Sequence, residues 1–151
     1  MLLRFFVFFM VEVPTGSMLP TINLNDRLLV TKIYNMETSI KRGDIIVFDS
    51  KELNKLLIKR CIGLPNDTVE VKTDGSVYIN GEKRDEPYVV NNQIGAQKNF
   101  KVPAGHYLFF GDNRSNSHDA RFWKEPYIPA SAIQAKARWV MWPFNRFGAL
   151  K

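Results

Sequence analysis

Apolar residues in this chain gather in short runs separated by turn signals, and no stretch keeps a helical period for several turns. The runs at 45–48 and 56–62 are typical of strands in a hydrophobic core. A third run at 68–72 alternates apolar and polar residues, turns at Asp74-Gly75 and resumes at 77–79, which is the pattern of a β-hairpin. The pattern therefore predicts an all-β fold.

Residues 82–101 differ from these runs because they are polar and rich in turn-forming residues, with Pro87, two adjacent asparagines and Gly95. Such a composition predicts a solvated excursion that rejoins the core near residue 102. We therefore expect one β domain at 13–151, within which 68–103 forms an inserted β-hairpin or cap subdomain.

The first 11 residues are apolar except for Arg4, and four of them are phenylalanine. A transmembrane helix needs roughly 20 apolar residues, so this stretch is too short to span a bilayer by itself. A cleaved signal peptide is disfavoured, because the charge lies inside the apolar run and no small-x-small site follows before Pro14. We expect residues 1–12 to be the remnant of an N-terminal membrane anchor, with a buried first strand as the alternative.

Composition narrows the class of protein. With 151 residues, of which 45% are hydrophobic and 13% aromatic, the chain is long enough for one globular domain with a real core. Lys and Arg outnumber Asp and Glu by 21 to 15, which favours an anionic partner such as a lipid surface or nucleic acid. The excess is spread along the chain, which argues against nucleic acid. Cys61 is the only cysteine, so an intrachain disulfide and a cysteine-based metal site are excluded.

Ser17 lies in the sequence PTGSMLPT at residues 14–21. A serine that follows glycine between two prolines is typical of a hydroxyl held in a fixed position, as a nucleophile must be. The local pattern also fits an ordinary turn serine, so it leaves both interpretations open. A nucleophilic serine needs a base.

Lys59 is the candidate base, because it stands inside the apolar run 56–62. To accept a proton near neutral pH its pKa must fall from about 10.4 towards 7 or 8, which costs the charged form roughly 4 kcal/mol and which burial can supply. Alternation along a strand places Leu57 and Lys59 on one face and Ile58 and Arg60 on the other. Arg60 is no alternative base, since a guanidinium does not lose its proton. An edge-strand lysine that protects against aggregation is the competing interpretation.

A third candidate segment, GDNRSNSHDAR at 111–121, follows the apolar run 107–110. It concentrates acidic, amide, hydroxyl and basic groups, which indicates either the organisation of a site or a solvated loop. His118 beside Asp119 suggests a Ser-His-Asp triad, yet adjacent residues in an extended segment point apart. Asp112 and Asp119 also form a candidate acid–base pair of carboxylates, but no other feature supports it. With two histidines and no ligand-spaced acidic cluster, we expect neither a metal nor a cofactor.

Taken together, the segments at 14–21, 41–48, 58–67 and 111–121 resemble, in order, those of the bacterial type I signal peptidases, or leader peptidases. The resemblance covers nearly the whole chain, including the closing segment 135–148. It implies a mostly antiparallel β fold and a membrane-anchored serine endopeptidase with a Ser-Lys dyad. The expected substrates are exported preproteins, cut after a small-x-small site such as Ala-x-Ala. The expected location is the cell membrane, with a single-pass anchor and the catalytic domain outside the cytoplasm.

The resemblance also assigns roles to single residues. It implies the following: nucleophile Ser17, general base Lys59, oxyanion-hole donors Thr15 and the Ser17 N–H, and the dyad-supporting residues Ser117, Asp119 and Arg121. Thr15 occupies a position where many relatives have serine. Threonine keeps the hydroxyl group but has a stiffer side-chain rotamer. Asn66 stands where glycine is frequent, and asparagine tolerates a left-handed turn.

The segment 138–144 carries two tryptophans beside basic residues, a composition that suits a lipid–water interface or, equally, a core strand. We expect a phospholipid membrane surface as a partner, and neither nucleic acid nor a metal. Two alternatives stay open: a self-cleaving, repressor-type Ser-Lys protease, and a non-catalytic basic β module that binds membrane or nucleic acid.

Overall fold

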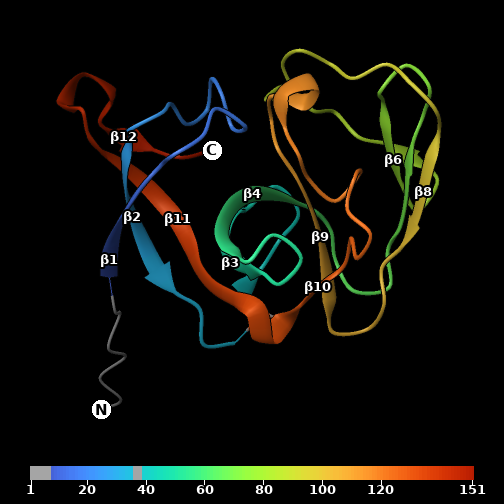
Figure 1. Cartoon of the computed structure of the whole chain (residues 1–151), viewed down its shortest axis with the longest axis horizontal. Helices are drawn as coiled ribbons and strands as arrows, with labels where there is room; N and C mark the ends of the chain where they lie inside the picture. Colours follow the sequence, from blue (N-terminus) through green and yellow to red (C-terminus); the bar gives the residue numbers. More distant parts are fainter. Residues whose placement is uncertain (1–7, 36–38) are drawn as a thin grey trace.

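The computed structural model describes residues 8–35 and 39–151. Over these residues the chain forms an eight-stranded sheet and a separate four-stranded sheet (Figure 1), and every strand pair is antiparallel. The predicted all-β, antiparallel fold is confirmed.

The larger sheet has the strand order β1-β2-β11-β3-β4-β9-β10, with β12 paired to β11. Its strands are β1 (Phe8–Glu12), β2 (Arg27–Lys32), β3 (Ile45–Ser50), β4 (Lys55–Gly63), β9 (His106–Phe110), β10 (Ile128–Pro129), β11 (Ile133–Trp142) and β12 (Gly148–Ala149). The smaller sheet has the order β7-β6-β5-β8, built from β5 (Thr68–Val71), β6 (Val77–Ile79), β7 (Glu82–Lys83) and β8 (Lys98–Lys101). Short 3₁₀ turns occur at η1 (Arg114–Asn116), η2 (Ala130–Ala132) and η3 (Phe144–Arg146).

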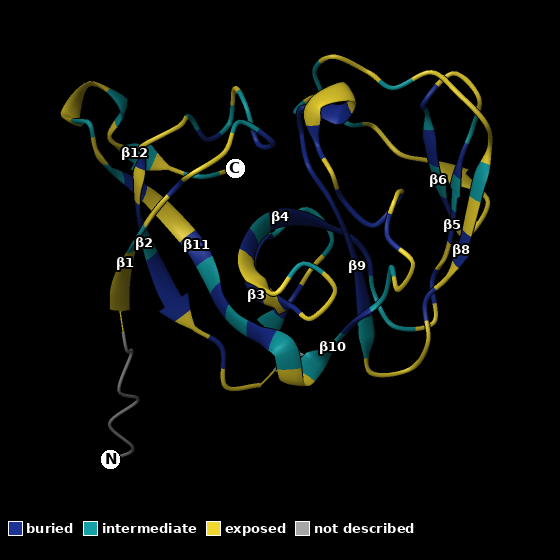
Figure 2. Ribbon diagram, in the orientation of Figure 1, coloured by how far each residue is buried: buried dark blue, intermediate teal, exposed yellow. Residues whose placement is uncertain are grey.

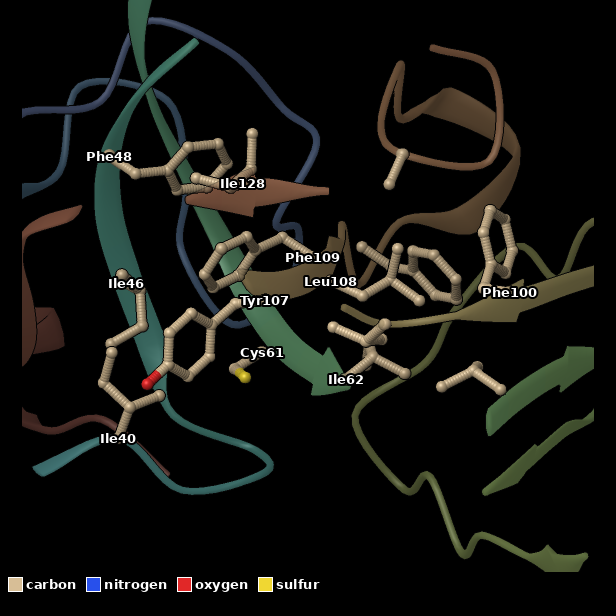
Figure 3. Close-up of a cluster of buried hydrophobic side chains, with 14 of the residues drawn as sticks. Ile40, Ile46, Phe48, Cys61, Ile62, Phe100, Tyr107, Leu108, Phe109 and Ile128 are labelled. Atoms are coloured by element: carbon tan, nitrogen blue, oxygen red, sulfur yellow. The ribbon is translucent and has the colours of Figure 1, made fainter. Parts of the chain in front are cut away.

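Two hydrophobic clusters stabilise this arrangement. The first joins the buried face of β3, β4 and β9 to the inner face of the smaller sheet, so one core holds both sheets together. Phe48 and Phe109 stack there with ring centroids 4.4 Å apart (Figure 3), and β9 is buried along most of its length (Figure 2). The second cluster lies between β2, β3 and β11 and includes Met18 and Ile22 from the segment that follows β1.

The apolar N-terminal segment ends as β1, an edge strand that pairs with β2. Its side chains are mostly exposed (Figure 2), with Phe8 54% and Met10 50% accessible, so 8–12 is a strand without being buried. Residues 1–7 lie outside the described residues, and the anchor expected there stays a prediction. Across 8–35 and 39–151, no helix is both long enough and apolar enough to cross a membrane.

The excursion at 82–101 is exposed over much of its length, as predicted, but its middle is not simply solvated. Val90 forms a parallel bridge with Asn113, and Glu86 forms an ion pair with the buried Arg114. The prediction was wrong for this part because pairing between two distant loops leaves no periodic signal in either of them.

Candidate active site

Ser17 lies in the turn between β1 and β2, with only 7% of its surface exposed. The turn is closed by two backbone hydrogen bonds, from Leu19 N to Gly16 O at 3.2 Å and from Ile22 N to Met18 O at 2.9 Å. Met18 and Ile22 are buried in the second hydrophobic cluster. The serine is therefore held on a turn that is anchored on its C-terminal side by apolar burial.

Lys59 approaches this serine from the middle of β4. It is 4% exposed, and its Nζ donates a hydrogen bond of 2.5 Å to Ser17 Oγ. Strand pairing places it opposite Ile46 of β3. The strand alternates as the sequence predicts, because Leu57 belongs to the first cluster whereas Ile58 packs against the second.

The environment of Lys59 makes its charged form less stable than it is in water. Burial lowers its pKa from 10.5 to about 8, although the negative charge of Asp119 partly opposes this shift. None of the ion pairs found among the described residues includes Lys59. A neutral Nζ accepts a proton, so the hydrogen bond reverses and Ser17 Oγ–H becomes the donor.

Arg60, the next residue, has a different environment. Its Nε donates to Asp112 Oδ1 at 2.9 Å and its Nη2 to Asp112 Oδ2 at 2.7 Å, and both side chains are buried. Thr21 Oγ1 donates to the same carboxylate at 2.6 Å. Asp112 thus connects β4 to the end of the Ser17 turn, and its engagement with Arg60 leaves no support for an Asp112–Asp119 acid–base pair.

Asn113 fixes the Ser17 turn directly. Its backbone N–H donates to Ser17 O at 3.0 Å, and its side-chain Nδ2 donates to Gly16 O at 3.0 Å. Both carbonyl groups of the Gly16-Ser17 pair are therefore bound by one residue of the 111–121 loop. Gly111 allows this approach, because a Cβ there would clash with Ser117 and lie 2.6 Å from Ser17 O.

The remaining loop residues form a second buried ion pair. Arg121 Nε donates to Asp119 Oδ1 at 2.8 Å and its Nη2 to Oδ2 at 2.9 Å. Gly111 N and Ser117 Oγ donate to Asp119 Oδ2 at 2.9 and 2.7 Å. Among the hydrogen bonds of the described residues, that of Ser117 goes to Asp119 and not to Lys59, so an orienting role for Ser117 stays a prediction.

Thr15 and His118 occupy more peripheral positions. Thr15 is exposed, and its Oγ1 lies 3.4 Å from Ser17 Oγ, beyond the usual length of a hydroxyl–hydroxyl hydrogen bond. His118 is exposed and stacks on Phe122 with ring centroids 6.3 Å apart. The contacts of Asp119 are with Arg121, Ser117 and Gly111, which is not the arrangement of a Ser-His-Asp triad.

Comparison with known proteins identifies the family. The family described as "Signal peptidase, peptidase S26" matches residues 1–142. The chain belongs to the S26 signal peptidase family. The chain is 44% identical to a signal peptidase I of Leptolyngbya laminosa, over 91% of this chain and 70% of that protein. It is 37% identical to signal peptidase I T of Bacillus subtilis (strain 168), over 100% of this chain and 82% of that one.

A solved structure agrees with this assignment. The crystal structure of a signal peptidase I from Enterococcus faecalis V583 matches with a TM-score of 0.56 and 30% identity, over 66% of this chain and 97% of that chain. The resemblance drawn from the four sequence segments is thereby confirmed, and so is membership of a serine peptidase family. Members of the S26 family are membrane-associated in general.

Three residues that contact the site in this S26 family member were not assigned a role from the sequence: Thr21, Arg60 and Asn113. All three lie inside the segments that carried the resemblance, so a signal was present. Their presence in these segments does not predict their roles, because the residues that they contact are far away in the chain. Arg60, for example, stands 52 positions from Asp112.

Proposed function

We propose that this S26 family member is a signal peptidase I, a serine endopeptidase that removes signal peptides from exported preproteins after a small-x-small site. Ser17 is the nucleophile and Lys59 the general base. The observation that carries the proposal is the 2.5 Å contact between Ser17 Oγ and Lys59 Nζ, made by a buried lysine whose pKa is lowered to about 8. A nucleophile and a base within hydrogen-bond reach are what acyl transfer requires.

The reaction proceeds in two halves. Neutral Lys59 accepts the Ser17 hydroxyl proton as Oγ attacks the scissile carbonyl carbon, and the resulting oxyanion is held by the Ser17 N–H and the Thr15 hydroxyl. The carbon–nitrogen bond then breaks, and Lys59 passes its proton to the leaving amine. Water, deprotonated by Lys59, hydrolyses the acyl-enzyme and regenerates Ser17.

Three residues of the 111–121 loop support the dyad in this scheme. Asp119 and Arg121 form a buried pair that holds the loop around Gly111, against which the Ser17 turn packs. Ser117, next to that contact, orients the ammonium group of Lys59. The charge of Asp119 raises the pKa of Lys59, so this pKa does not fall as far as burial alone would take it.

The pH dependence follows from the base. Only neutral Lys59 accepts the Ser17 proton, and its pKa is lowered to about 8. The rate constant kcat/KM therefore rises with pH and levels off above about 8, with the acid limb set by Lys59.

A cleavage assay tests the dyad. The substrate is a peptide that contains one Ala-x-Ala site, and the product is identified by mass. Ser17→Ala and Lys59→Met should abolish cleavage, while His118→Ala should leave it within about twofold, since the His118 ring is exposed and stacks on Phe122. An active Lys59→Met variant together with an inactive His118→Ala variant would contradict the Ser-Lys assignment.

The second element of the proposal is contact with a phospholipid membrane surface, the chain being held by a single-pass anchor with its catalytic domain outside the cytoplasm. Exposed aromatic side chains at Trp139, Trp142, Phe144 and Phe147 surround η3 and the ends of β11 and β12, close to Arg138 and Arg146. Aromatic rings beside cations suit the interface of an anionic bilayer.

Vesicle sedimentation tests this contact. Anionic phosphatidylglycerol vesicles should retain wild type, and the double variant Trp142→Ser/Phe144→Ser should bind several-fold more weakly. Ile94→Ser is the control, because Ile94 is also an exposed hydrophobic residue but belongs to the excursion at 82–101. Equal loss of binding in the control variant, or none in the double variant, would contradict this surface.

A further inference from the structure

Residues 86–91, here called the strap, run along the loop that holds Ser17. Val90 N donates to Asp112 O at 3.0 Å, Arg114 N donates to Val90 O at 3.0 Å, and Ser115 N donates to Asn91 O at 2.7 Å. The strap thus adds a short parallel pairing to the loop. Because β7 ends at Lys83, just before the strap, this pairing links the smaller sheet to the catalytic turn.

Side chains reinforce the pairing. Glu86 accepts hydrogen bonds from the Arg114 guanidinium at 3.2 and 2.7 Å, and Arg114 is 1% exposed. The Tyr88 ring lies 3.9 Å from the Arg60 guanidinium carbon, a cation–π contact, and its hydroxyl donates to Glu86 at 3.1 Å. The strap therefore contacts a buried cation on the loop and another on β4.

The contact that bears on catalysis is made by Asn91. Its Nδ2 donates to Asn113 Oδ1 at 2.7 Å, and Asn116 Nδ2 approaches the same oxygen at 3.3 Å. An amide side chain has one oxygen that accepts and one nitrogen that donates, at opposite corners. With the oxygen of Asn113 bound to Asn91, its nitrogen points to Gly16 O. The reversed amide would set two oxygens against each other there.

We infer that Asn91 is a positioning residue: by fixing the amide of Asn113, it holds the Gly16 carbonyl and hence the Ser17 hydroxyl in place for attack. This inference rests on the proposed role of Ser17. Asn91 itself touches neither Ser17 nor Lys59 in the contacts of the described residues. It acts through Asn113, and its effect is on the reacting geometry and not on substrate binding.

Asn92 provides a matched control. It is the same residue type at the next position and is likewise exposed, but its Nδ2 donates to Asp74 O in the β5–β6 turn of the smaller sheet. Glycine is the suitable replacement for Asn91, because its φ of 47° lies in the left-handed region that glycine tolerates and alanine does not. Asn91→Gly and Asn92→Gly therefore remove the same side chain from neighbouring positions.

The experiment measures kcat and KM separately on the Ala-x-Ala peptide. Asn91→Gly should lower kcat roughly tenfold with KM changed less than about twofold, since loss of alignment affects the chemical step. Asn92→Gly should stay within about twofold of wild type in both constants. In an Asn113→Ala background, Asn91→Gly should add less than about twofold, because the two residues act in series.

Asn91→Asp is the second variant, since it keeps the side-chain volume and the tolerance of a left-handed φ while replacing the donor by a carboxylate oxygen. It should lower kcat at least as much as Asn91→Gly at an unchanged thermal midpoint. Unchanged kcat in both Asn91 variants, or an equal fall in Asn92→Gly, or full additivity with Asn113→Ala, would overturn the inference. An active Ser17→Ala variant would instead overturn the proposed dyad, so the two failures are distinguishable.

Discussion

Lys59 and Arg60 are consecutive basic residues of one strand, and both are buried. They point to opposite faces of β4, where they meet different partners. On one face the Arg60 guanidinium meets a carboxylate through two hydrogen bonds, at 2.9 and 2.7 Å. On the other, the Lys59 ammonium meets the hydroxyl group of Ser17. Burial is similar on both faces, at 4% exposure for Lys59 and 1% for Arg60, so the counter-charge is what differs.

The difference shows how one strand can hold both a structural cation and a base. A buried charge without a partner is costly, and the cost is relieved either by an ion pair or by loss of the proton. Arg60 has the ion pair and cannot lose its proton. Lys59 has no ion pair among the described residues and a pKa lowered to about 8, so the energy that disfavours its charge also prepares it as a base.

The largest effect, a loss of peptide cleavage, is expected when a guanidinium replaces the ammonium group of Lys59. Lys59→Arg places a permanent cation beside Ser17, so the base is lost while the charge remains. Cleavage of the Ala-x-Ala peptide should fall by about 10²–10⁴-fold, the contribution of a general base, and should not recover up to pH 9. Lys55→Arg, at the exposed start of the same strand, is the control and should cleave normally. A Lys59→Arg variant with a tenth of wild-type activity would show that Lys59 is not the base.

The second change removes the counter-charge from the Arg60 face. Asp112→Asn leaves the buried Arg60 without a carboxylate, and breaking such a pair costs about 3–5 kcal/mol of unfolding free energy. Urea denaturation followed by tryptophan fluorescence measures the loss. Asp85→Asn, an exposed carboxylate, should change the unfolding free energy by less than about 0.5 kcal/mol. If the two variants are equally stable, the Arg60–Asp112 pair does not hold β4 to the loop.

The third and smallest expected effect is the pH dependence of the unfolding free energy that arises from Lys59. Between about pH 8 and 10.5 the unfolded chain keeps the Lys59 proton that the folded chain has released, so the stability of the wild type rises with pH through this window. The rise amounts to roughly 3 kcal/mol, and the corresponding penalty is fully present below pH 8. Lys59→Met has no proton to lose, so its advantage over wild type should be largest at pH 7 and should shrink as the pH rises to 10.

Denaturation of both proteins at pH 7, 8.5 and 10 measures this difference. His118→Ala serves as the control, because its replacement leaves Lys59 in place. A difference between Lys59→Met and wild type that stays constant over the three pH values would mean that Lys59 keeps its proton in the folded state up to its ordinary pKa.

What the sequence predicts well is what depends on near neighbours. The apolar run around Lys59 predicts its burial and the alternation of β4 predicts its face, because both follow from residues within a few positions. The β5–β6 hairpin is predicted for the same reason: Gly75 supplies the positive φ of 85° that its turn requires. Segment order then indicated that Ser17 and Lys59 meet, through resemblance to a family.

What the sequence does not predict depends on which strands become neighbours. Arg60 and Asp112 meet because β4 pairs with β9, and Asn113 reaches Gly16 only after that pairing has brought the 111–121 loop to the Ser17 turn. The middle of the excursion at 82–101 is polar, which predicts solvation, but Glu86 and Asn91 bind Arg114 and Asn113 of the 111–121 loop. In each case the contact that positions the residue joins two segments far apart in the chain, and the sequence pattern of one segment does not predict the other as its partner.

The pairing of β4 with β3 and β9 has one further consequence for how sequence changes are tolerated. Ile46 faces Lys59 and Ile45 faces Arg60 across the β3–β4 hairpin, whose turn lies between Ser50 and Lys55. An insertion in that turn lengthens a surface loop and leaves every pair intact. Deletion of Ile58 would instead move the following half of the strand back by one position, which places Arg60 where Lys59 was and exchanges the faces of lysine and arginine. Such a protein would have the same net charge and an intact Ser17 turn, but a guanidinium would stand where the proton acceptor belongs. The register of the β3–β4 pair therefore determines whether the site has a base.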